Sequence, residues 1–379
     1  MGEIASKKIL FLTGTRADFG KLKSLMQVVK EEPEFDYIIF ATGMHMQRTY
    51  GYTVLEIEKS GFENIRTFDN HTSEMTMDLS LAKTIEGLSC WVKEEKPDLI
   101  VVHGDRIETL AGAIVGSLNN ILVAHIEGGE LSGTIDELIR HSVTKLSHVH
   151  FVSNQEAKKR LMQMGELESS IFEIGSPDID TMFSESLPDL SLVKRYYDIE
   201  FDQYAIAMFH PVTTEVHGIQ DHVSNFVTAL LDTDRNYVVI YPNNDHGSER
   251  ILKEYLRLEN NSRFRIIPSM RFEYFLSLLK NSDFIIGNSS AGIREAHYYK
   301  VPSINIGTRQ QNRSTNAEII NCGYSIEDIL KSIGETEVVS FPKERFDFGN
   351  GDSAGKFLNV IRSEDIWKIE HQKQFRDIS

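Results

Sequence analysis

The chain has 379 residues, of which 41% are hydrophobic and 25% are charged, and this length predicts two domains of roughly 150–200 residues each. The formal net charge of -16 argues against nucleic acid as the main partner, because phosphate backbones bind basic surfaces. The apolar run 9–12 is too short for a signal peptide, and no run approaches the roughly 20 apolar residues of a membrane helix. The two cysteines, Cys90 and Cys322, lie far apart and predict no disulfide framework. We therefore expect a cytoplasmic protein that is not bound to a membrane.

Short apolar runs rich in β-branched residues recur in the first half, each followed by small or polar residues and then a helical pattern. These runs are 9–13, 37–42, 99–103, 121–126 and 149–153. Uninterrupted apolar strands are typical of a parallel sheet that is covered by helices on both faces. The first half therefore predicts a doubly wound α/β domain.

The same rhythm restarts in the second half of the chain. Its apolar runs are 204–210, 237–242, 264–268, 284–287 and 303–307, and 272–280 reads as a helix. The predicted fold class is therefore α/β, with two Rossmann-like doubly wound domains and a ligand cleft between them. We place the domains at 1–178 and 179–355. The segment from Lys356 to about Phe375 reads as a two-part helix, and we expect 356–379 to pack back on the first domain.

Carboxylates follow the apolar strands of the first half, at the strand ends where open parallel sheets bind ligands. Asp105 follows the run 99–103, Glu127 follows the run 121–126, and Asp136 lies nine residues farther on. Burial and neighbouring charges can tune such groups for proton transfer on a sugar. The alternative for Asp136 is a helix cap that pairs with Arg140, four residues away on the same helix face.

Phosphate-binding candidates also follow strands. The loop at Gly14 starts a helix close to a ligand, and Arg16 offers a forked phosphate contact, although a tight turn with a solvated arginine explains it equally well. In the second half, small and polar residues follow each strand, and Asn243 either contacts a nucleoside or makes a turn. The candidates there are His210, Asn243, Ser289, Ser290, Gly292, Glu295, Arg309 and Arg313. The turn at 287–295 can hold a diphosphate without a metal, although a capped helix is the simpler alternative.

Seven motifs in order resemble one known family, the hydrolysing UDP-N-acetylglucosamine 2-epimerases that open bacterial sialic acid synthesis. The motifs are GTRAD at 14–18, HGDR at 103–106, HIEGGE at 125–130, TIDELIRH at 134–141, FHPVT at 209–213, GNSSAGIRE at 287–295 and NIGTRQ at 305–310. Non-hydrolysing relatives carry Glu-Glu where this chain has Asp136-Glu137, and they lack the GNSS form. Both departures favour the hydrolysing branch.

The resemblance implies two Rossmann domains of the GT-B type, with UDP held mainly by the second. From the residues we expect no cofactor, and whether a divalent ion assists stays open. UDP-N-acetylglucosamine would undergo anti elimination of UDP to 2-acetamidoglucal, and water addition would then give N-acetylmannosamine. By position, Asp105, Glu127 and Asp136 match the family's catalytic carboxylates. The matches to its UDP-binding positions are His210, Ser289, Ser290, Glu295 and Arg309, together with Arg16, Arg106 and Asn243. Family members are commonly homodimers or homotetramers.

Other functions remain open at this point. A legionaminic-pathway homologue would hydrolyse UDP-2,4-diacetamido-2,4,6-trideoxyglucose with the same motifs. A glycosyltransferase of this fold usually needs a single base, and a non-catalytic UDP-sugar sensor needs no carboxylate triad. A hydride-transfer enzyme is disfavoured by the absence of a dinucleotide fingerprint. The 13 histidines show no HExxH or Cys/His spacing, so we expect no metal site.

Overall fold

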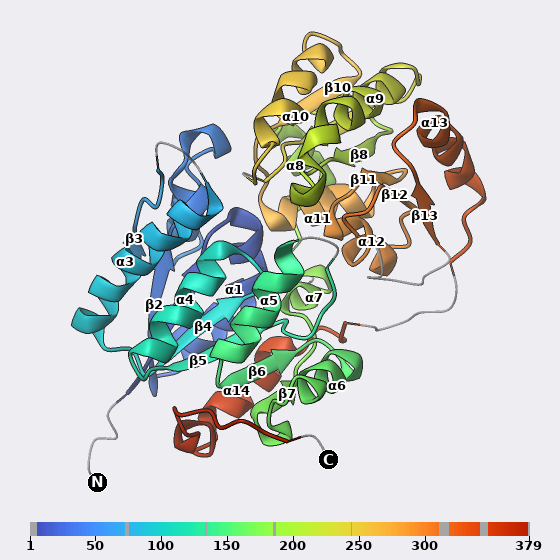
Figure 1. Ribbon diagram of the computed structural model, residues 1–379. Coiled ribbons are helices and arrows are strands. Elements are labelled where there is room, and N and C mark those ends of the chain that lie inside the picture. The colour runs from blue at the N-terminus through green and yellow to red at the C-terminus, as the bar shows by residue number, and fades with distance from the viewer. Residues whose placement is uncertain are drawn as a thin grey trace. The chain divides into compact units, whose positions relative to one another are not determined.

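The computed structural model describes residues 6–72, 76–132, 135–184, 187–243, 245–310, 318–341 and 348–377. The chain divides into two compact units. Unit 1 comprises Met1–Glu130, Asp136–Ser184 and Asp347–Ser379, and unit 2 comprises Leu131–Ile135 and Glu185–Phe346. Each unit is built on its own parallel sheet, which confirms the predicted fold class (Figure 1). Within the described ranges, no helix combines the length and hydropathy needed to cross a bilayer.

The sheet of unit 1 has seven strands in the order β3-β2-β1-β4-β5-β6-β7. They are β1 Lys7–Thr13, β2 Phe35–Ala41, β3 Ile65–Thr67, β4 Leu99–His103, β5 Leu122–Ile126, β6 Val149–Val152 and β7 Ile171–Glu173. The five predicted strands are confirmed, whereas the edge strands β3 and β7 were missed because they are only partly buried and their polar residues leave no apolar run. The strand order reverses between β1 and β4, and ligands of open sheets bind at such a reversal.

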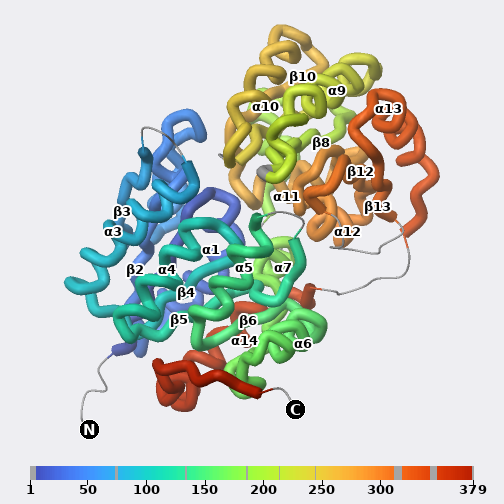
Figure 2. The backbone as a smooth tube through the Cα atoms, in the orientation of Figure 1, coloured from blue at the N-terminus to red at the C-terminus, as the bar shows by residue number. Residues whose placement is uncertain are grey.

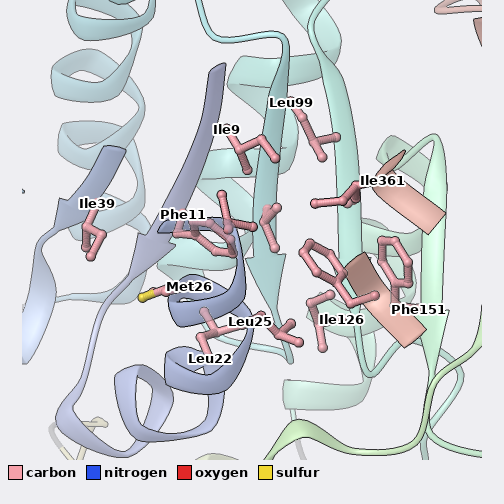
Figure 3. Close-up of a cluster of buried hydrophobic side chains, with 14 of the residues drawn as sticks. Ile9, Phe11, Leu22, Leu25, Met26, Ile39, Leu99, Ile126, Phe151 and Ile361 are labelled. Carbon is pink, nitrogen blue, oxygen red and sulfur yellow. The ribbon is translucent and has the colours of Figure 1, made fainter. Parts of the chain in front are cut away.

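Helices cover this sheet and bury its apolar side chains. They are α1 Arg16–Glu31, α2 Val54–Lys59, α3 Met77–Glu95, α4 Ile107–Leu118, α5 Ile135–Leu146, α6 Gln155–Gln163, α7 Pro177–Met182 and α14 Ser353–Arg362. Successive side chains of a strand point to opposite faces, so Ile9 and Phe11 of β1 face one layer of helices. Figure 3 shows them packed with Leu22 and Leu25 of α1 and Ile361 of α14.

The C-terminal helix α14 therefore belongs to the core of unit 1. The ring of Phe357 lies 4.8 Å from the ring of Phe151 in β6. The carboxylate of Asp180 accepts hydrogen bonds of 2.8 Å from the backbone N–H groups of Ser353 and Ala354 at the start of α14. These contacts attach the last part of the chain to the first sheet.

The prediction of a second helical part reaching Phe375 is wrong. After α14 the chain forms only a 3-10 turn, η8 Ile366–Lys368, and the following residues are not helical. The ammonium group of Lys373 donates instead to the Ser147 carbonyl at 2.7 Å and to Glu166 Oε2 at 2.5 Å. These side-chain contacts hold the segment after α14 against unit 1.

Unit 2 repeats the plan with six strands in the order β10-β9-β8-β11-β12-β13. They are β8 Ala205–Met208, β9 Tyr237–Ile240, β10 Phe264–Ile267, β11 Ile285–Gly287, β12 Ser303–Ile306 and β13 Ile319–Cys322. The helices are α8 Leu190–Tyr196, α9 Ile219–Leu231, α10 Ser248–Tyr255, α11 Phe272–Lys280, α12 Glu295–Tyr298 and α13 Ile326–Glu335. In chain order the strands run from β8 out to β10 and then continue from β11 on the other side of β8, so this sheet reverses between β8 and β11. Figure 2 shows β8 between β10 and β12. The helix predicted at 272–280 is confirmed as α11, and only the short β13 was missed.

Candidate active site

The turn after β4 presents Asp105 at the carboxyl edge of the first sheet. Gly104 has a φ of 74°, which glycine adopts without steric cost, and its N–H donates to the Ile126 carbonyl at 3.0 Å. His125 Nε2–H donates to the Gly104 carbonyl at 2.8 Å. Burial lowers the pKa of His125 to about 3, against the opposing effect of this hydrogen bond. A neutral histidine therefore fixes the turn that carries Asp105.

Arg140 of α5 joins the loops after β4 and β5. One guanidinium nitrogen, Nη1, donates to the Glu127 carbonyl at 2.6 Å, and the other, Nη2, forms an ion pair with Asp105. The side chain of Arg140 is almost fully buried. A single cation thus holds two of the predicted carboxylate positions together in unit 1.

Glu127 has an unusual backbone and a buried side chain. Its φ of 63° lies in the left-handed region, which costs a residue with a Cβ roughly 1 kcal/mol or more and is characteristic of functional sites. The side chain is 3% exposed. Ser176 donates its hydroxyl to Oε1, and His103 Nε2 lies 3.2 Å from Oε2. Both carboxylate oxygens are therefore oriented by neighbouring side chains.

His103, the last residue of β4, lies between two carboxylates. Its Nδ1 is 2.7 Å from Asp18 Oδ1, on the opposite side of the ring from Glu127. Burial alone would lower the pKa of His103, but the charge of Glu127 in the ion pair at Nε2 and the hydrogen bond to Asp18 outweigh it and raise the pKa to about 9. At neutral pH this histidine is an imidazolium.

Asp136 lies in the first turn of α5, which begins at Ile135. It is one helical turn before Arg140, so both side chains project from the same face of the helix. That face carries the guanidinium which contacts Asp105 and the Glu127 loop. Because Asp136 lies inside α5, it is not the N-cap residue of that helix. The predicted i+4 relation to Arg140 is compatible with this placement.

The polar side chains in the loop after β1 mainly form hydrogen bonds with backbone groups of the same loop. Thr15 caps α1 by accepting from the Asp18 N–H at 3.0 Å, and Asp18 Oδ2 accepts from the Gly14 N–H at 3.1 Å. Arg16 Nη2 lies 3.9 Å from Glu56 Oε1. Asp18 therefore already places a negative charge at the helix start where a phosphate was predicted.

Arg106, the N-cap residue of α4, lies beside a second buried carboxylate. Its Nε donates to Glu108 Oε2 at 3.3 Å. Glu108 also packs against the backbone of the loop after β1, since a Cβ on Gly14 would lie 2.9 Å from the Glu108 carboxyl carbon. Arg106 is thus placed at the same sheet edge as Asp105.

In unit 2, His210 and Asn288 meet at the reversal between β8 and β11. Asn288 Oδ1 accepts from the His210 N–H at 2.6 Å, and Asn288 Nδ2 donates to the His210 carbonyl at 2.9 Å. The Asn243 N–H donates to His210 Nδ1 at 3.1 Å. Because Nδ1 accepts, the neutral imidazole carries its hydrogen on Nε2 and can donate it to an anion. Asn243 Oδ1 is buried and receives no hydrogen bond from the residues that the structure describes.

The turn after β11 carries the two predicted hydroxyls. Ser289 caps a 3-10 turn, η6 Ser290–Gly292, and its hydroxyl accepts from the Ala291 N–H at 3.3 Å. Both serines are half-buried. Gly292 is required by close packing, because a Cβ there would lie 2.5 Å from the Ser303 hydroxyl.

The interpretation of Glu295 as one turn into a helix needs correction. The Ile293 N–H bonds the Ser290 carbonyl three residues back and closes a 3-10 turn, and the Arg294 N–H reaches the same carbonyl before α12 starts. Glu295 is instead the first residue of the four-residue helix α12 and is buried. The turn therefore offers individual N–H groups and hydroxyls to a ligand rather than the dipole of a long helix.

Arg309 reaches the same turn from the loop after β12. Its Nη1 donates to the Asn288 carbonyl at 3.3 Å, and Gln310 Nε2 donates to that carbonyl at 2.9 Å. Glu215 Oε1 accepts from the Thr308 hydroxyl at 2.5 Å, which anchors the loop just before Arg309. Arg313 and the residue after Asn243, Asn244, lie outside the described residues.

Several residues of this arrangement were not singled out from the sequence. They are Asp18, His103, Ser176, Asn288 and Gln310. Four lie inside the motifs at 14–18, 103–106, 287–295 and 305–310, so their position at or just beyond the end of a strand was the available signal. Ser176 lies in none of these motifs, and no sequence signal pointed to it. Among the described residues, no group of three or more His, Cys, Asp or Glu side chains is placed to hold a metal ion.

Each unit thus offers its own chemistry. In unit 1, carboxylates at the carboxyl ends of β4 and β5 are positioned by Arg140, Ser176 and His103, which is suited to acid–base catalysis. In unit 2, an imidazole N–H, two hydroxyls and a guanidinium gather at one sheet edge, which is suited to a diphosphate.

Known proteins resemble the chain over nearly its whole length. It is 46% identical to a UDP-N-acetylglucosamine 2-epimerase of Neisseria meningitidis serogroup B over 98% of this chain and 100% of that protein. It is 32% identical to the UDP-N,N'-diacetylbacillosamine 2-epimerase (hydrolyzing) of Legionella pneumophila, covering 94% and 96% of the two chains. It is 33% identical to polysialic acid biosynthesis protein P7 of Escherichia coli, covering 88% and 87%.

The fold also matches solved structures. The UDP-GlcNAc 2-epimerase of Methanocaldococcus jannaschii, solved in complex with UDP-GlcNAc and UDP, aligns with a TM-score of 0.77 at 23% identity, over 93% of this chain and 99% of that chain. At this identity the match supports the fold. The family model described as UDP-N-acetylglucosamine 2-epimerase matches residues 27–362. Since that match includes strands of both sheets and every candidate residue except Arg16, this chain belongs to the UDP-N-acetylglucosamine 2-epimerase family.

Proposed function

We propose that the protein is a hydrolysing UDP-N-acetylglucosamine 2-epimerase, which converts UDP-N-acetylglucosamine and water to N-acetylmannosamine and UDP for sialic acid synthesis. The observation that carries this proposal is the pair of carboxylates Asp105 and Glu127, gathered around Arg140 at adjacent strand ends. The Neisseria and Escherichia coli relatives support the substrate and the pathway.

The reaction begins with anti elimination across C1 and C2 of the sugar. A base removes the C2 proton, UDP departs from C1, and 2-acetamidoglucal remains. The C2 proton of a sugar is very weakly acidic, so elimination needs both a positioned base and stabilisation of the departing diphosphate. We assign the elimination to Asp105.

Water then adds across the double bond and yields N-acetylmannosamine. We assign this hydration to Glu127 and Asp136, which lie beyond the same strand. The diphosphate would be bound by His210, Ser289, Ser290 and Arg309, with Glu295 and Asn243 accepting hydrogen bonds from the nucleoside. Arg16 and Arg106 would approach the substrate from the strand ends of unit 1.

A second substrate has a specific observation in its favour. The Legionella relative carries the name of a hydrolysing enzyme for UDP-N,N'-diacetylbacillosamine, and the chain is 32% identical to it. That sugar is a 2,4-diacetamido-2,4,6-trideoxyglucose, and the proposed chemistry at C1 and C2 is the same. The two substrates differ at C4 and C6, where no residue has been assigned.

Proton NMR of turnover in heavy water tests the proposal. UDP-N-acetylglucosamine should give N-acetylmannosamine with deuterium at C2 and free UDP. A product that keeps its original C2 proton would contradict elimination and addition. Turnover of the diacetamido-trideoxy sugar alone would assign the second substrate, and UDP binding without release from either sugar would indicate a sensor. We further infer a cytoplasmic homodimer or homotetramer, which light scattering during gel filtration would measure.

A further inference from the structure

A buried histidine lies beside the proposed catalytic carboxylates and takes no part in the reaction as assigned above. His103 is 10% exposed in its side chain and ends β4, two residues before Asp105. Its ring nitrogens face Asp18 Oδ1 at 2.7 Å and Glu127 Oε2 at 3.2 Å. The three side chains form a line that starts at α1 and ends at the loop after β5.

The geometry dictates the charge of this ring. A carboxylate only accepts hydrogen bonds, whereas a neutral imidazole has one donor nitrogen and one acceptor nitrogen. A neutral His103 would turn a lone pair toward one of its two carboxylates. The arrangement is satisfied only when both nitrogens carry hydrogen, which makes His103 a cation between Asp18 and Glu127.

The ring is also fixed in place. Asp18 is held by the Gly14 N–H at 3.1 Å on its second oxygen and by the Thr15 hydroxyl on its own N–H. The hydroxyl of Thr109 in α4 donates to the His103 carbonyl at 2.7 Å. Neither Asp18 nor the histidine backbone can shift without breaking hydrogen bonds to other elements, so the direction of Nε2 toward Glu127 is set by the fold.

This cation stabilises the charge of Glu127. Its side chain is 3% exposed, and a carboxylate removed from water becomes neutral unless it is paired or hydrogen-bonded. Ser176 donates one uncharged hydrogen bond to Oε1. The guanidinium of Arg140 contacts the Glu127 main chain and pairs with Asp105. The imidazolium of His103 pairs directly with Oε2 at 3.2 Å.

We propose that His103 is a positioning residue, fixed by Asp18, that keeps Glu127 ionised and oriented for its part in the reaction. This inference rests on the proposed function, because it concerns the carboxylate assigned to hydration. His103 itself does not touch the sugar. It acts through Glu127, which must be anionic to accept a proton from water.

The charged and titratable groups around this pair come from four elements. They are Asp18 of α1, His125 of β5, Arg140 of α5 and Asp105 after β4. Burial keeps His125 neutral, and Arg140 forms an ion pair with Asp105. We therefore expect the charge of His103, 3.2 Å from Glu127 Oε2, to shift the pH dependence of Glu127.

The first test is independent of activity. In protein labelled with 15N-histidine, assigned by the signals that vanish in His103→Gln, both ring nitrogens of His103 should be protonated at pH 7 and titrate with a midpoint of about 9. In Glu127→Gln that midpoint should fall by roughly one unit or more. A neutral His103 at pH 7 in the unaltered protein, or an unchanged midpoint in Glu127→Gln, would overturn the proposal.

The second test is the pH profile of turnover. In His103→Gln, which keeps an amide donor but no charge, the acid limb of kcat should move upward by roughly one to three pH units, with little change in KM. Ser176→Ala is the matched control, because it removes the uncharged donor to the other oxygen. It should lower kcat and leave the limb in place. The proposed role of the charge would be overturned if the acid limb moved equally in His103→Gln and Ser176→Ala, or if it moved in neither variant.

Failure of the proposed function is distinguishable from failure of this inference. If the unaltered protein turns over neither UDP-sugar, the function is wrong, while the 15N titration still measures the pairing of His103 with Glu127. If turnover proceeds and the titration or the pH profile disagrees, the function stands and the positioning role is wrong. The exposed histidine variant His371→Gln should leave the profile unchanged.

Discussion

Asn288 holds the backbone of His210 on both sides, accepting from its N–H at 2.6 Å and donating to its carbonyl at 2.9 Å. This clamp connects the ends of β8 and β11, where the strand order of unit 2 reverses. It therefore fixes the imidazole that we assign to the diphosphate before any ligand binds. The carbonyl of Asn288 also accepts from Arg309 and Gln310, so one residue organises both cationic and neutral donors.

Asn288→Ala should lower the free energy of unfolding by about 1–3 kcal/mol, because it removes the two part-buried hydrogen bonds to the His210 backbone. The same variant should weaken UDP binding. Urea denaturation and calorimetric titration with UDP measure the two effects. Asn288→Asp is the informative comparison, since it keeps the acceptor for the His210 N–H and loses only the donor. Equal stability of all three proteins would contradict the structural role of the clamp.

Arg309→Ala should weaken UDP binding by about 1.5–3 kcal/mol, or roughly 10- to 150-fold, because a charge-assisted contact to the diphosphate is lost. Isothermal titration with UDP gives the affinity directly. Arg257→Ala is a suitable control, since Arg257 is a partly exposed arginine of the same unit that pairs with Glu254. Unchanged UDP affinity in Arg309→Ala would return this residue to its role of holding the Asn288 carbonyl.

Asp105→Asn, Glu127→Gln and Asp136→Asn should separate binding from chemistry. Each keeps its shape but can no longer accept a proton, so UDP affinity should stay close to that of the unaltered protein while turnover falls by roughly two decades or more. Steady-state kinetics and UDP titration provide both numbers.

The two half-reactions should separate among these variants. Glu127→Gln and Asp136→Asn should release 2-acetamidoglucal, or hydrate it slowly when it is supplied, whereas Asp105→Asn should be blocked before it forms. NMR of the reaction mixture identifies the accumulating sugar. Full activity of Asp136→Asn would leave that residue a structural partner of Arg140.

Because the pKa of the buried residue His45 is low, we expect the protein to lose stability in mild acid. It lies between the hydroxyls of Thr13 at 3.1 Å and Thr53 at 2.8 Å, and burial lowers its pKa from 6.5 to about 4. The unfolded chain therefore binds the proton first, and stability present above pH 6.5 is lost as the pH falls toward 4. This one group should contribute a decrease on the order of 3 kcal/mol over that interval.

Urea denaturation between pH 4.5 and 7.5 measures this effect. His45→Gln should be less stable at neutral pH but should show a shallower decline in acid, because it cannot take up the proton. His141→Gln, which replaces a largely exposed histidine, serves as the control. A decline in His45→Gln as steep as that of the unaltered protein would contradict the assignment.

The sequence by itself determined the fold class and the places where chemistry gathers. Apolar runs such as 99–103 and 237–242 predict buried strands, and in a parallel sheet their carboxyl ends meet at one edge. That rule led to the prediction of Asp105, Glu127, His210 and the turn at Ser289 as site residues. The edge strands β3 and β13 were missed, because they are only partly buried and their polar residues interrupt the apolar pattern.

The tertiary structure decided how these residues are held. Asp18 and His103 are 85 residues apart in sequence, and Ser176 lies 49 residues from Glu127, so no local spacing predicts that they meet. The charge of His103 follows only from its two carboxylate neighbours, and the accepting role of His210 Nδ1 only from the Asn243 N–H. The hydrophobic periodicity of the sequence shows which residues face the core, because burial repeats at regular intervals along a helix or strand. The interaction between two charged side chains depends on the distance between them, and for residues of different elements that distance is set only once the chain has folded.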